Sequence, residues 1–236
     1  ITWDDFEKAG AKYYAATGKN FGTCDTAGST TLSLMLGEQK SDYTTTDGKP
    51  AINSPEMVKA LSKLKEMQNT HAIATMPGGQ PDTTDGEAAI NAGDYAVVIK
   101  ALWFMGRFTT YMPEQSGKWA IATPPIFEKG DVATIGDGGT GTVVTKTAKN
   151  KDNVKAFLAY AKLSEDGQQA IWEDLGFDPT NMDLWNNNDI THNKDNQYVK
   201  FFKTNPFDVL NSMKGSIGLI KSVEASPNIG NQFVTT

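Results

Sequence analysis

The chain has 236 residues, of which 39% are hydrophobic and 21% charged, and its formal net charge is −6. This length is enough for one sizeable core or for two lobes of ordinary domain size. No window approaches the roughly 18 uninterrupted apolar residues of a membrane helix. No concentrated Lys/Arg face is visible either. The composition therefore argues against a membrane-spanning chain and against nucleic acid as a partner.

The sequence contains few cysteine and histidine residues that could take part in catalysis or bind a metal. Cys24 is the only cysteine, and His71 and His192 are the only histidines. No internal disulfide can form, and a Cys/His catalytic pair or a zinc site has too few ligands. We expect Cys24 to be a partly buried structural thiol, and we expect no metal site and no cofactor.

The first part of the chain predicts three helices. Thr2 is expected to cap a helix that ends at Gly18, and a second helix is expected over residues 29–36. Ser54 followed by Pro55 is a strong start signal for the third helix. The buried stripe of the third helix is expected to consist of Met57, Leu61, Leu64 and Met67.

Residues 90–107 carry the most informative pattern. A turn at Gly93 leads into an apolar segment over residues 95–99, which reads as a buried strand, and Trp103 and Phe104 follow it. In an open α/β sheet, ligands collect at the carboxyl ends of the strands. An indole at that place, with no thiolate, metal cluster or catalytic base beside it, favours a chain that holds a small molecule without transforming it.

The second half continues the α/β alternation. A strand is expected over residues 118–122, and the prolines after it indicate a chain that leaves one sheet for another. A glycine cluster at residues 136–141 leads into a strand expected over residues 142–145. A second crossover is expected near residues 176–179. The helices expected between these two points span residues 152–163, with Val154, Phe157, Leu158 and Ala161 inward, and residues 164–175, with Ile171 and Trp172 inward.

Two segments match known binding motifs in part, but each lacks a feature that its motif requires. The spacing of Gly136, Gly138 and Gly141 matches the dinucleotide fingerprint, but the residues that follow read as a strand and not as the helix that the fingerprint requires. A tight glycine turn is the ordinary alternative. The Asn/Asp-rich run at residues 186–195 lacks the central glycine and closing glutamate of a calcium loop, which favours a solvated polar loop.

Several segments, in their order and spacing, resemble the extracellular solute-binding proteins of ABC sugar importers, the family of maltose-binding protein. Thr2-Trp3-Asp4-Asp5-Phe6 looks like the helix opening that follows the family's first crossover between lobes, and residues 88–97 are similar to its strand entry. Trp103 stands where the family often carries a sugar-stacking tryptophan. Further similar segments are residues 119–125, 138–141, 150–161 and 164–170.

This resemblance implies an α/β, periplasmic-binding-protein-like fold of two lobes, here mainly the carboxyl-terminal lobe plus a segment of the amino-terminal lobe. By the same match, residues 1–122 and 180–236 belong to the carboxyl-terminal lobe, and residues 123–179 belong to the amino-terminal lobe together with the crossovers. Most of the amino-terminal lobe has no counterpart. We therefore expect residues 142–145 and the two following helices either to pack in a swapped dimer or to leave a large apolar patch exposed.

The resemblance also implies a sugar or oligosaccharide ligand in a cleft between the lobes, delivery to the membrane permease of an ABC importer, and no catalysis. A sugar ring lies flat on an aromatic face, and its hydroxyls bind polar donors and acceptors. Each candidate has a plain alternative: core packing for Trp103, a helix cap for Asp25, and a tight turn for the glycines. The candidate ligand-binding residues are Asp25, Thr26, Trp103, Phe104, Asp137, Gly138, Gly139, Trp185 and Phe233.

Two other classes of function remain open. A glycan-hydrolysing enzyme would need two carboxyl groups on either side of the scissile bond, and 28 acidic residues nominate no particular pair. A binding domain for a solute other than a sugar is the second alternative. The sequence opens without a charged n-region or an apolar h-region. With a leader outside this sequence, the resemblance implies an extracellular protein, either a cell-surface lipoprotein or periplasmic.

Overall fold

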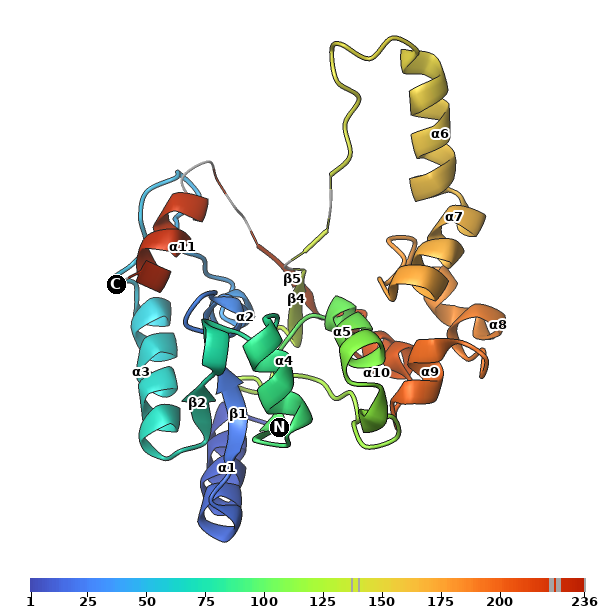
Figure 1. Cartoon of the computed structure of the whole chain (residues 1–236). Coiled ribbons are helices and arrows are strands. Elements are labelled where there is room, and N and C mark those ends of the chain that lie inside the picture. The colour runs from blue at the N-terminus through green and yellow to red at the C-terminus, as the bar shows by residue number, and fades with distance from the viewer. Residues whose placement is uncertain (137, 140, 221–222, 224–225, 236) are drawn as a thin grey trace. The chain divides into compact units, whose positions relative to one another are not determined.

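The computed structural model describes all residues except 137, 140, 221–222, 224–225 and 236, and only the backbone of residues 227, 231 and 233–235. The chain forms two compact units (Figure 1). Unit 1 comprises Ile1–Lys100, Thr123–Asp137 and Gly215–Thr236, and unit 2 comprises Ala101–Ala122 and Gly138–Lys214. These boundaries differ from those expected for the lobes, and the assignment of residues to lobes stays a prediction.

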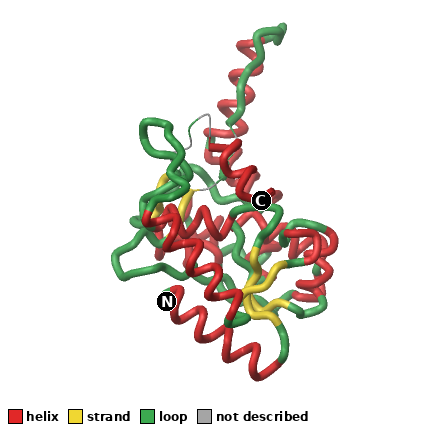
Figure 2. Tube along the Cα trace, turned by 90° about the vertical axis from the view of Figure 1, so that its left-hand side faces the viewer, coloured by secondary structure: helices red, strands yellow, loops and turns green. Residues whose placement is uncertain are grey.

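Unit 1 is built around a parallel three-stranded sheet, drawn in yellow in Figure 2. Its strands are β1 (Asn20–Cys24), β2 (Ile73–Thr75) and β3 (Tyr95–Val97), in the order β2-β1-β3. Parallel neighbours require a helical crossover. These crossovers contain α2 (Thr30–Glu38), α3 (Pro55–Asn69) and α4 (Thr84–Asn91), while α1 (Trp3–Thr17) precedes β1.

The caps of the helices in unit 1 follow from the sequence. Thr2 Oγ1 accepts a hydrogen bond from Asp5 N, and Asp5 Oδ2 accepts one from Thr2 N, which is a capping box. α1 ends at Gly18, whose φ of 68° lies in the left-handed region. Ser54 caps α3 and accepts from Met57 N. The predicted start and end of α1 and the predicted start of α3 are therefore confirmed.

The apolar core of unit 1 joins α1, α2 and α3 to the sheet. Of the stripe expected on α3, Met57 and Met67 are fully buried and Leu64 packs partly against the core. The prediction is wrong for Leu61, which is 39% exposed. Ala60 is buried instead, because residues 57, 60, 64 and 67 share one face of the helix and residue 61 has rotated off it.

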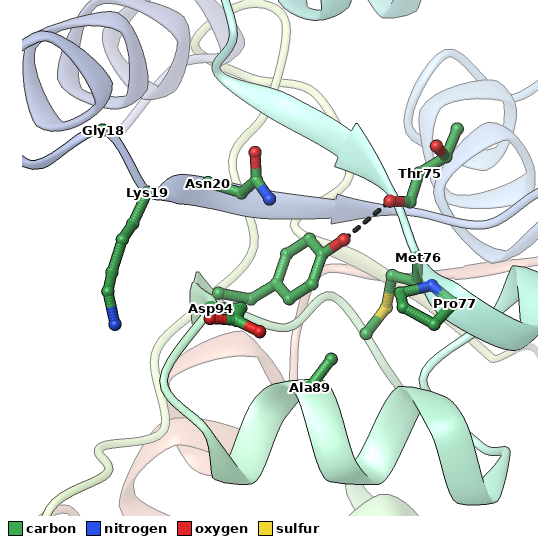
Figure 3. A pocket seen from close by; sticks show the side chains of 9 residues that line it. Gly18, Lys19, Asn20, Thr75, Met76, Pro77, Ala89 and Asp94 are labelled. Atoms are coloured by element: carbon green, nitrogen blue, oxygen red, sulfur yellow. Dashed lines mark hydrogen bonds between the residues drawn. The ribbon is translucent and has the colours of Figure 1, made fainter.

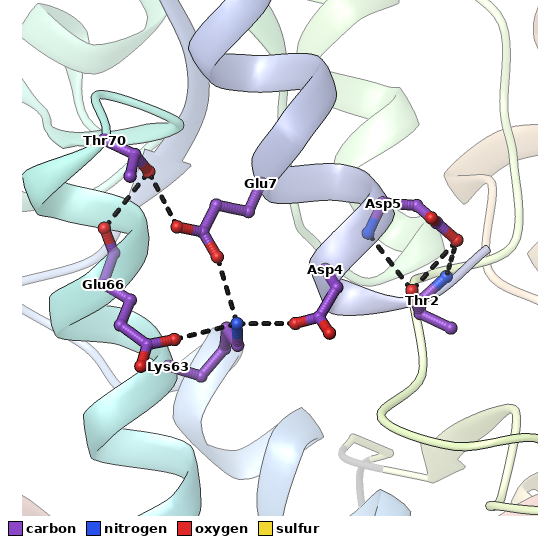
Figure 4. Close-up of polar contacts among 7 residues, drawn as sticks. All are labelled: Thr2, Asp4, Asp5, Glu7, Lys63, Glu66 and Thr70. Carbon is purple, nitrogen blue, oxygen red and sulfur yellow. Dashed lines mark hydrogen bonds and ion pairs between the residues drawn. The ribbon is translucent and has the colours of Figure 1, made fainter.

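An ion cluster joins α1 and α3 at the surface (Figure 4). The ammonium of Lys63 lies 2.6 Å from Asp4 Oδ1, 3.0 Å from Glu7 Oε2 and 2.9 Å from Glu66 Oε2. Three carboxylates share one lysine that is itself largely covered. The cluster thus fixes the two helices against each other through charge as well as through apolar packing.

A second, two-stranded parallel sheet in unit 1 is formed by β4 (Thr134–Gly136) and β5 (Ile217–Leu219). α2 packs against both strands, and a Cβ at Gly37 would overlap the side chain of Ile135. Only glycine allows α2 and β4 to approach so closely. The last helix, α11 (Ser226–Thr235), also belongs to unit 1.

Helices and helical turns are the regular secondary structure among the described residues of unit 2. Two aromatic groups form much of its interior, one around Trp172 and Phe207 and the other around Phe108. Its helices are α5 (Met105–Tyr111), α6 (Lys151–Leu163), α7 (Glu165–Ala170), α8 (Asn188–Thr191), α9 (Gln197–Phe201) and α10 (Pro206–Met213), and its short helical turns are η2 (Leu102–Phe104), η3 (Pro113–Gln115), η4 (Ile171–Leu175) and η5 (Leu184–Asn186).

Two expected strands are absent. Residues 118–122 form none: Ile121 N donates to Thr204 Oγ1 at 2.6 Å, and Lys203 N donates to the carbonyl of Trp119 at 2.9 Å. Residues 142–145 form no strand either, and no pairing partner for them occurs in the described part of the chain. A strand needs an adjacent strand as its pairing partner, and both predictions were wrong because neither segment has one among the described residues.

The helices after residue 150 form, but the apolar face of the first one is uncovered. None of the side chains of α6 is buried, and Phe157 is 67% and Leu163 73% exposed. In Figure 1, α6 extends beyond the other helices of unit 2. The expected inward packing of Phe157 is therefore wrong, whereas Trp172 is fully buried as expected. Exposed apolar surface is one of the two arrangements that the sequence predicted for this segment.

Candidate functional site

The carboxyl edge of the three-stranded sheet brings Asp25 and Lys100 together. Gly22 of β1 is paired with Val97 of β3, so the residues three positions further along each strand reach the same level beyond the edge. Lys100 Nζ lies 3.4 Å from Asp25 Oδ2 and 3.4 Å from Thr30 Oγ1. The two charged side chains are almost excluded from solvent, at 2% exposed for Asp25 and 9% for Lys100.

The loop after β1 is tied to the loop after β2, which contains the helical turn η1 (Pro77–Gly79). The backbone N–H groups of Thr26 and Ala27 donate to the carbonyl of Gly79 at 2.7 and 2.9 Å. Gly79 has a φ of 78°, and a Cβ there would lie 2.8 Å from that of Ala27. A glycine is needed at residue 79, therefore, both for its backbone angle and for the close contact.

The polar groups at this edge are incompletely satisfied. Asp25 Oδ1 is buried and has no hydrogen-bond partner among the described residues. A buried carboxylate oxygen without a partner is rare and costs free energy. Such an atom is a candidate contact for a hydroxyl group from water or from a ligand.

The thiol beside this edge is inert. Burial, and to a smaller degree the neighbouring Asp25 carboxylate, raises the pKa of Cys24 to about 11. Gln68 Nε2 donates to Cys24 Sγ at 3.8 Å. The side chain therefore stays a protonated thiol at neutral pH, as expected of a structural cysteine.

Trp103 and Phe104 lie in unit 2 and have different environments. Phe104 is only 3% exposed and packs edge-on against Phe108. Trp103 is half-buried, meets Phe104 edge-on at 5.9 Å, and has the guanidinium carbon of Arg107 at 5.9 Å from its ring centroid. Trp103 thus keeps accessible ring surface, whereas Phe104 is a core residue in this structure.

The remaining candidates are spread over unit 2 and the undescribed positions. Trp185 is buried and its Nε1 donates to the carbonyl of Pro179 at 2.8 Å, so its ring offers no open face. Gly138 and Gly139 are exposed, with open space where a Cβ would be. Asp137 and the side chain of Phe233 lie outside the described residues. Of the predicted residues, Asp25 and Thr26 lie together at the carboxyl edge in unit 1, and Trp103 and Phe104 are in contact in unit 2.

Sequence reasoning missed Lys100, Thr30 and Gly79. Lys100 lies three residues beyond Val97, and Asp25 lies three residues beyond Gly22, the partner of Val97, so their alignment depends on the strand register. The contribution of Gly79 could not be read locally, since it depends on a turn that starts more than fifty residues earlier in the chain.

A cavity of about 490 Å³ lies beside the sheet in unit 1 (Figure 3). Tyr95 crosses from β3 and donates its hydroxyl to the carbonyl of Thr75 at 2.6 Å. Lys19 and Asp94 lie at its margin, and Met76 and Ala89 contribute apolar surface. None of the residues predicted to bind ligand lines this cavity, so we place the candidate site at the carboxyl edge.

Metal binding and membrane insertion find no support in the described part of the chain. No group of three or more His, Cys, Asp or Glu side chains there is arranged to hold a metal ion. None of the helices described has both the length and the apolar character that crossing a bilayer would require.

Comparison with known sequences finds relatives along almost the whole chain. The arabinooligosaccharide-binding protein of Bacillus subtilis (strain 168) is 39% identical over 221 residues, which are 93% of this chain and 51% of that protein. The arabinooligosaccharide-binding protein of Halalkalibacterium halodurans is 35% identical over 235 residues, 99% of this chain and 52% of that protein. The chain therefore spans about half the length of these curated relatives.

Comparison with solved structures supports the fold. The sugar-binding protein MalE from Xanthomonas citri superimposes with a TM-score of 0.74 at 14% identity, over 99% of this chain and 56% of that chain. The solute-binding protein Lmo0181 from Listeria monocytogenes, solved with cycloalternan, gives a TM-score of 0.66 at 16% identity, over 100% of this chain and 58% of that chain. The predicted α/β, periplasmic-binding-protein-like fold class is confirmed.

A family model described as bacterial extracellular solute-binding protein matches residues 1–169, well over half of the chain. This match, the two curated relatives and the confirmed fold all agree with the resemblance seen in the sequence motifs. The chain belongs to the family of bacterial extracellular solute-binding proteins.

Proposed function

We propose that this chain provides part of the binding site of an extracellular solute-binding protein that captures arabinooligosaccharides for an ABC importer. The observation that carries the proposal is the identity of 39% and 35% with two proteins named for binding arabinooligosaccharides. The two matches cover 93% and 99% of this chain.

The chemistry of the candidate site suits an uncharged sugar. Asp25 supplies carboxylate oxygens that accept from hydroxyls, and Thr26, which is exposed, supplies a hydroxyl that can donate or accept. Unit 2 separately offers the indole face of Trp103, on which the apolar side of a sugar ring can lie. Gly138 and Gly139 would contribute exposed backbone. In this proposal the chain binds its ligand and does not cleave it.

The transport step follows from a population shift. A ligand that contacts both lobes favours the closed arrangement only to the extent that it binds the closed state better than the open one. The closed form would then be the one that the membrane permease recognises, at the cell surface as a lipoprotein or in the periplasm. Because this chain spans about half the length of its relatives, we expect its own affinity for sugar to be weak.

A titration tests the proposal. Nuclear magnetic resonance shifts of the chain are followed while arabinotriose is added to tens of millimolar, with maltotriose as the comparison sugar. We expect saturable shifts near Asp25 and Thr26 with arabinotriose at millimolar concentrations, and smaller ones with maltotriose. No saturable shift with arabinotriose would contradict the proposed ligand. Shorter sugars released during the titration would indicate a hydrolase instead.

A further inference from the structure

We propose that Lys100 is a positioning residue of the proposed sugar site, which holds Asp25 by one carboxylate oxygen and leaves the other for a ligand hydroxyl. This inference rests on the proposed function. It starts from an asymmetry in the Asp25 carboxylate: Oδ2 lies 3.4 Å from Lys100 Nζ, whereas Oδ1 has no partner among the described residues.

The backbone fixes this pairing. β1 and β3 are hydrogen-bonded neighbours up to Gly22 and Val97, and Ile99 N then donates to Thr23 Oγ1 at 3.4 Å, which carries the alignment past the end of the ladder. Asp25 and Lys100 each lie three residues beyond the pair of Gly22 and Val97. Their contact therefore follows the register of the two strands.

The ion pair with Asp25 compensates the buried positive charge of Lys100. Its ammonium is also 3.4 Å from Thr30 Oγ1, at the amino end of α2, where the helix dipole disfavours a positive charge. In the described part of the chain, Asp25 is the carboxylate that pairs with Lys100. Each buried charge is thus tolerated because of the other, and removing one alone would leave an uncompensated buried ion.

The unpartnered Oδ1 gives the pair a use beyond structure. If the Asp25 carboxylate had only a structural role, a second hydrogen-bond donor to Oδ1 would stabilise it. The described residues around Oδ1 supply no such donor. The turn next to it consists of Thr26 and Ala27, which are exposed. A small displacement of this turn would admit a sugar hydroxyl, which would donate to Oδ1 while Lys100 keeps Oδ2 in place.

A double-mutant cycle separates positioning from stability. The variants are Lys100→Met, Asp25→Asn and the two combined, with Lys59→Met as the control, since Lys59 forms an exposed ion pair with Glu128 in the same unit. Two quantities are measured for each: the free energy of unfolding in urea and the dissociation constant for arabinotriose from nuclear magnetic resonance shifts.

We expect Lys100→Met to lower both stability and sugar affinity, with affinity reduced about three- to tenfold. The combined variant carries no buried charge, so it should regain much of the stability, while its affinity stays low because no carboxylate is held for the hydroxyl. Lys59→Met should change neither quantity appreciably. Lys100→Arg, which keeps the charge, should retain part of the affinity.

Two results would overturn the inference. If the combined variant recovered the original affinity along with its stability, the pair would be purely structural. If Lys100→Met bound arabinotriose as well as the unchanged chain does, Asp25 would need no positioning. Failure of the unchanged chain to bind arabinotriose at all would instead count against the proposed function, which keeps the two failures distinct.

Discussion

Trp3 Nε1 donates a hydrogen bond to Glu38 Oε2 at 2.9 Å, and both side chains are only 1% exposed. This contact joins the start of α1 to the last residue of α2 inside the core of unit 1. The second oxygen of Glu38, Oε1, is buried without a partner among the described residues. Burial raises the pKa of Glu38 to about 8, against a smaller lowering effect of the Trp3 hydrogen bond, and the charge of Asp131 raises it slightly further.

The first prediction is that unit 1 loses stability as the pH rises from about 4.5 to about 8. Glu38 has a pKa near 4.5 when unfolded and about 8 when folded. Between these values the unfolded chain binds fewer protons than the folded one, so the free energy of unfolding falls with rising pH and levels off above pH 8. The total change from this group is at most about 5 kcal/mol, at about 1.4 kcal/mol per pKa unit.

The Glu38→Gln variant isolates this effect. Its amide stays neutral, so the difference in unfolding free energy between variant and original should move in favour of the variant as the pH rises through this range. Urea denaturation at several pH values measures it, and Glu56→Gln, on α3 of the same unit, serves as the control. A difference that did not vary with pH would show that Glu38 is ionised in the folded chain.

The second prediction concerns the ion cluster of α1 and α3. Replacing Lys63 by Met leaves Asp4, Glu7 and Glu66 near one another without their shared cation. We expect a loss of roughly 1–3 kcal/mol in unfolding free energy, because Lys63 is largely covered and its partners then repel one another. The loss should shrink at high salt. Lys65→Met, at an exposed position on the same helix, should cost little.

The third prediction distinguishes Trp103 from its aromatic neighbours. Trp103→Ala should weaken arabinotriose binding severalfold while leaving the circular dichroism spectrum unchanged, because the ring surface proposed to hold the sugar is lost. Tyr111→Ala is the matched control, because Tyr111 is exposed and also lies near Arg107. Phe104→Ala should instead destabilise unit 2 by about 3–5 kcal/mol. Unchanged affinity in Trp103→Ala would remove the proposed stacking role.

The fourth prediction is that the apolar face of α6 drives self-association. Phe157, Tyr160 and Leu163 are all more than half exposed on this helix, and exposed apolar surface of this kind favours contacts between molecules. Sedimentation should detect dimers or larger species that decrease in Phe157→Glu and not in Lys155→Glu. A monomeric chain at high concentration would argue against both the swapped dimer and any other pairing through α6.

Local signals made part of this fold predictable. α1 and α3 begin at Thr2 and Ser54 because each cap depends on residues within one helical turn. Residues 142–145 have equally suitable side chains for a strand, but a strand depends on a partner elsewhere. No such partner occurs among the residues that the structure describes. The local sequence of residues 142–145 could not reveal whether a pairing partner exists elsewhere in the chain.

The candidate site also contains some residues that the local sequence predicts and others that depend on distant contacts. Asp25 was predicted as an acid that precedes a helix, and it lies at the edge of the sheet where ligands are expected. Lys100, whose contact with it depends on the pairing of two strands, was missed. Trp103 and Phe104 are adjacent in sequence and equally aromatic. Only the packing of Phe104 against Phe108 separates an accessible ring from a core residue.

The parallel pairing of β4 and β5 affects how the protein is made. β4 lies at residues 134–136, and its partner at residues 217–219 is separated from it by the larger segment of unit 2, Gly138–Lys214. During synthesis on the ribosome β4 must therefore wait for its partner, with its edge open, until most of the chain has emerged. Contacts of such high contact order close slowly. Completion of unit 1 is thus a late event, because it requires that residues 217–219 have emerged.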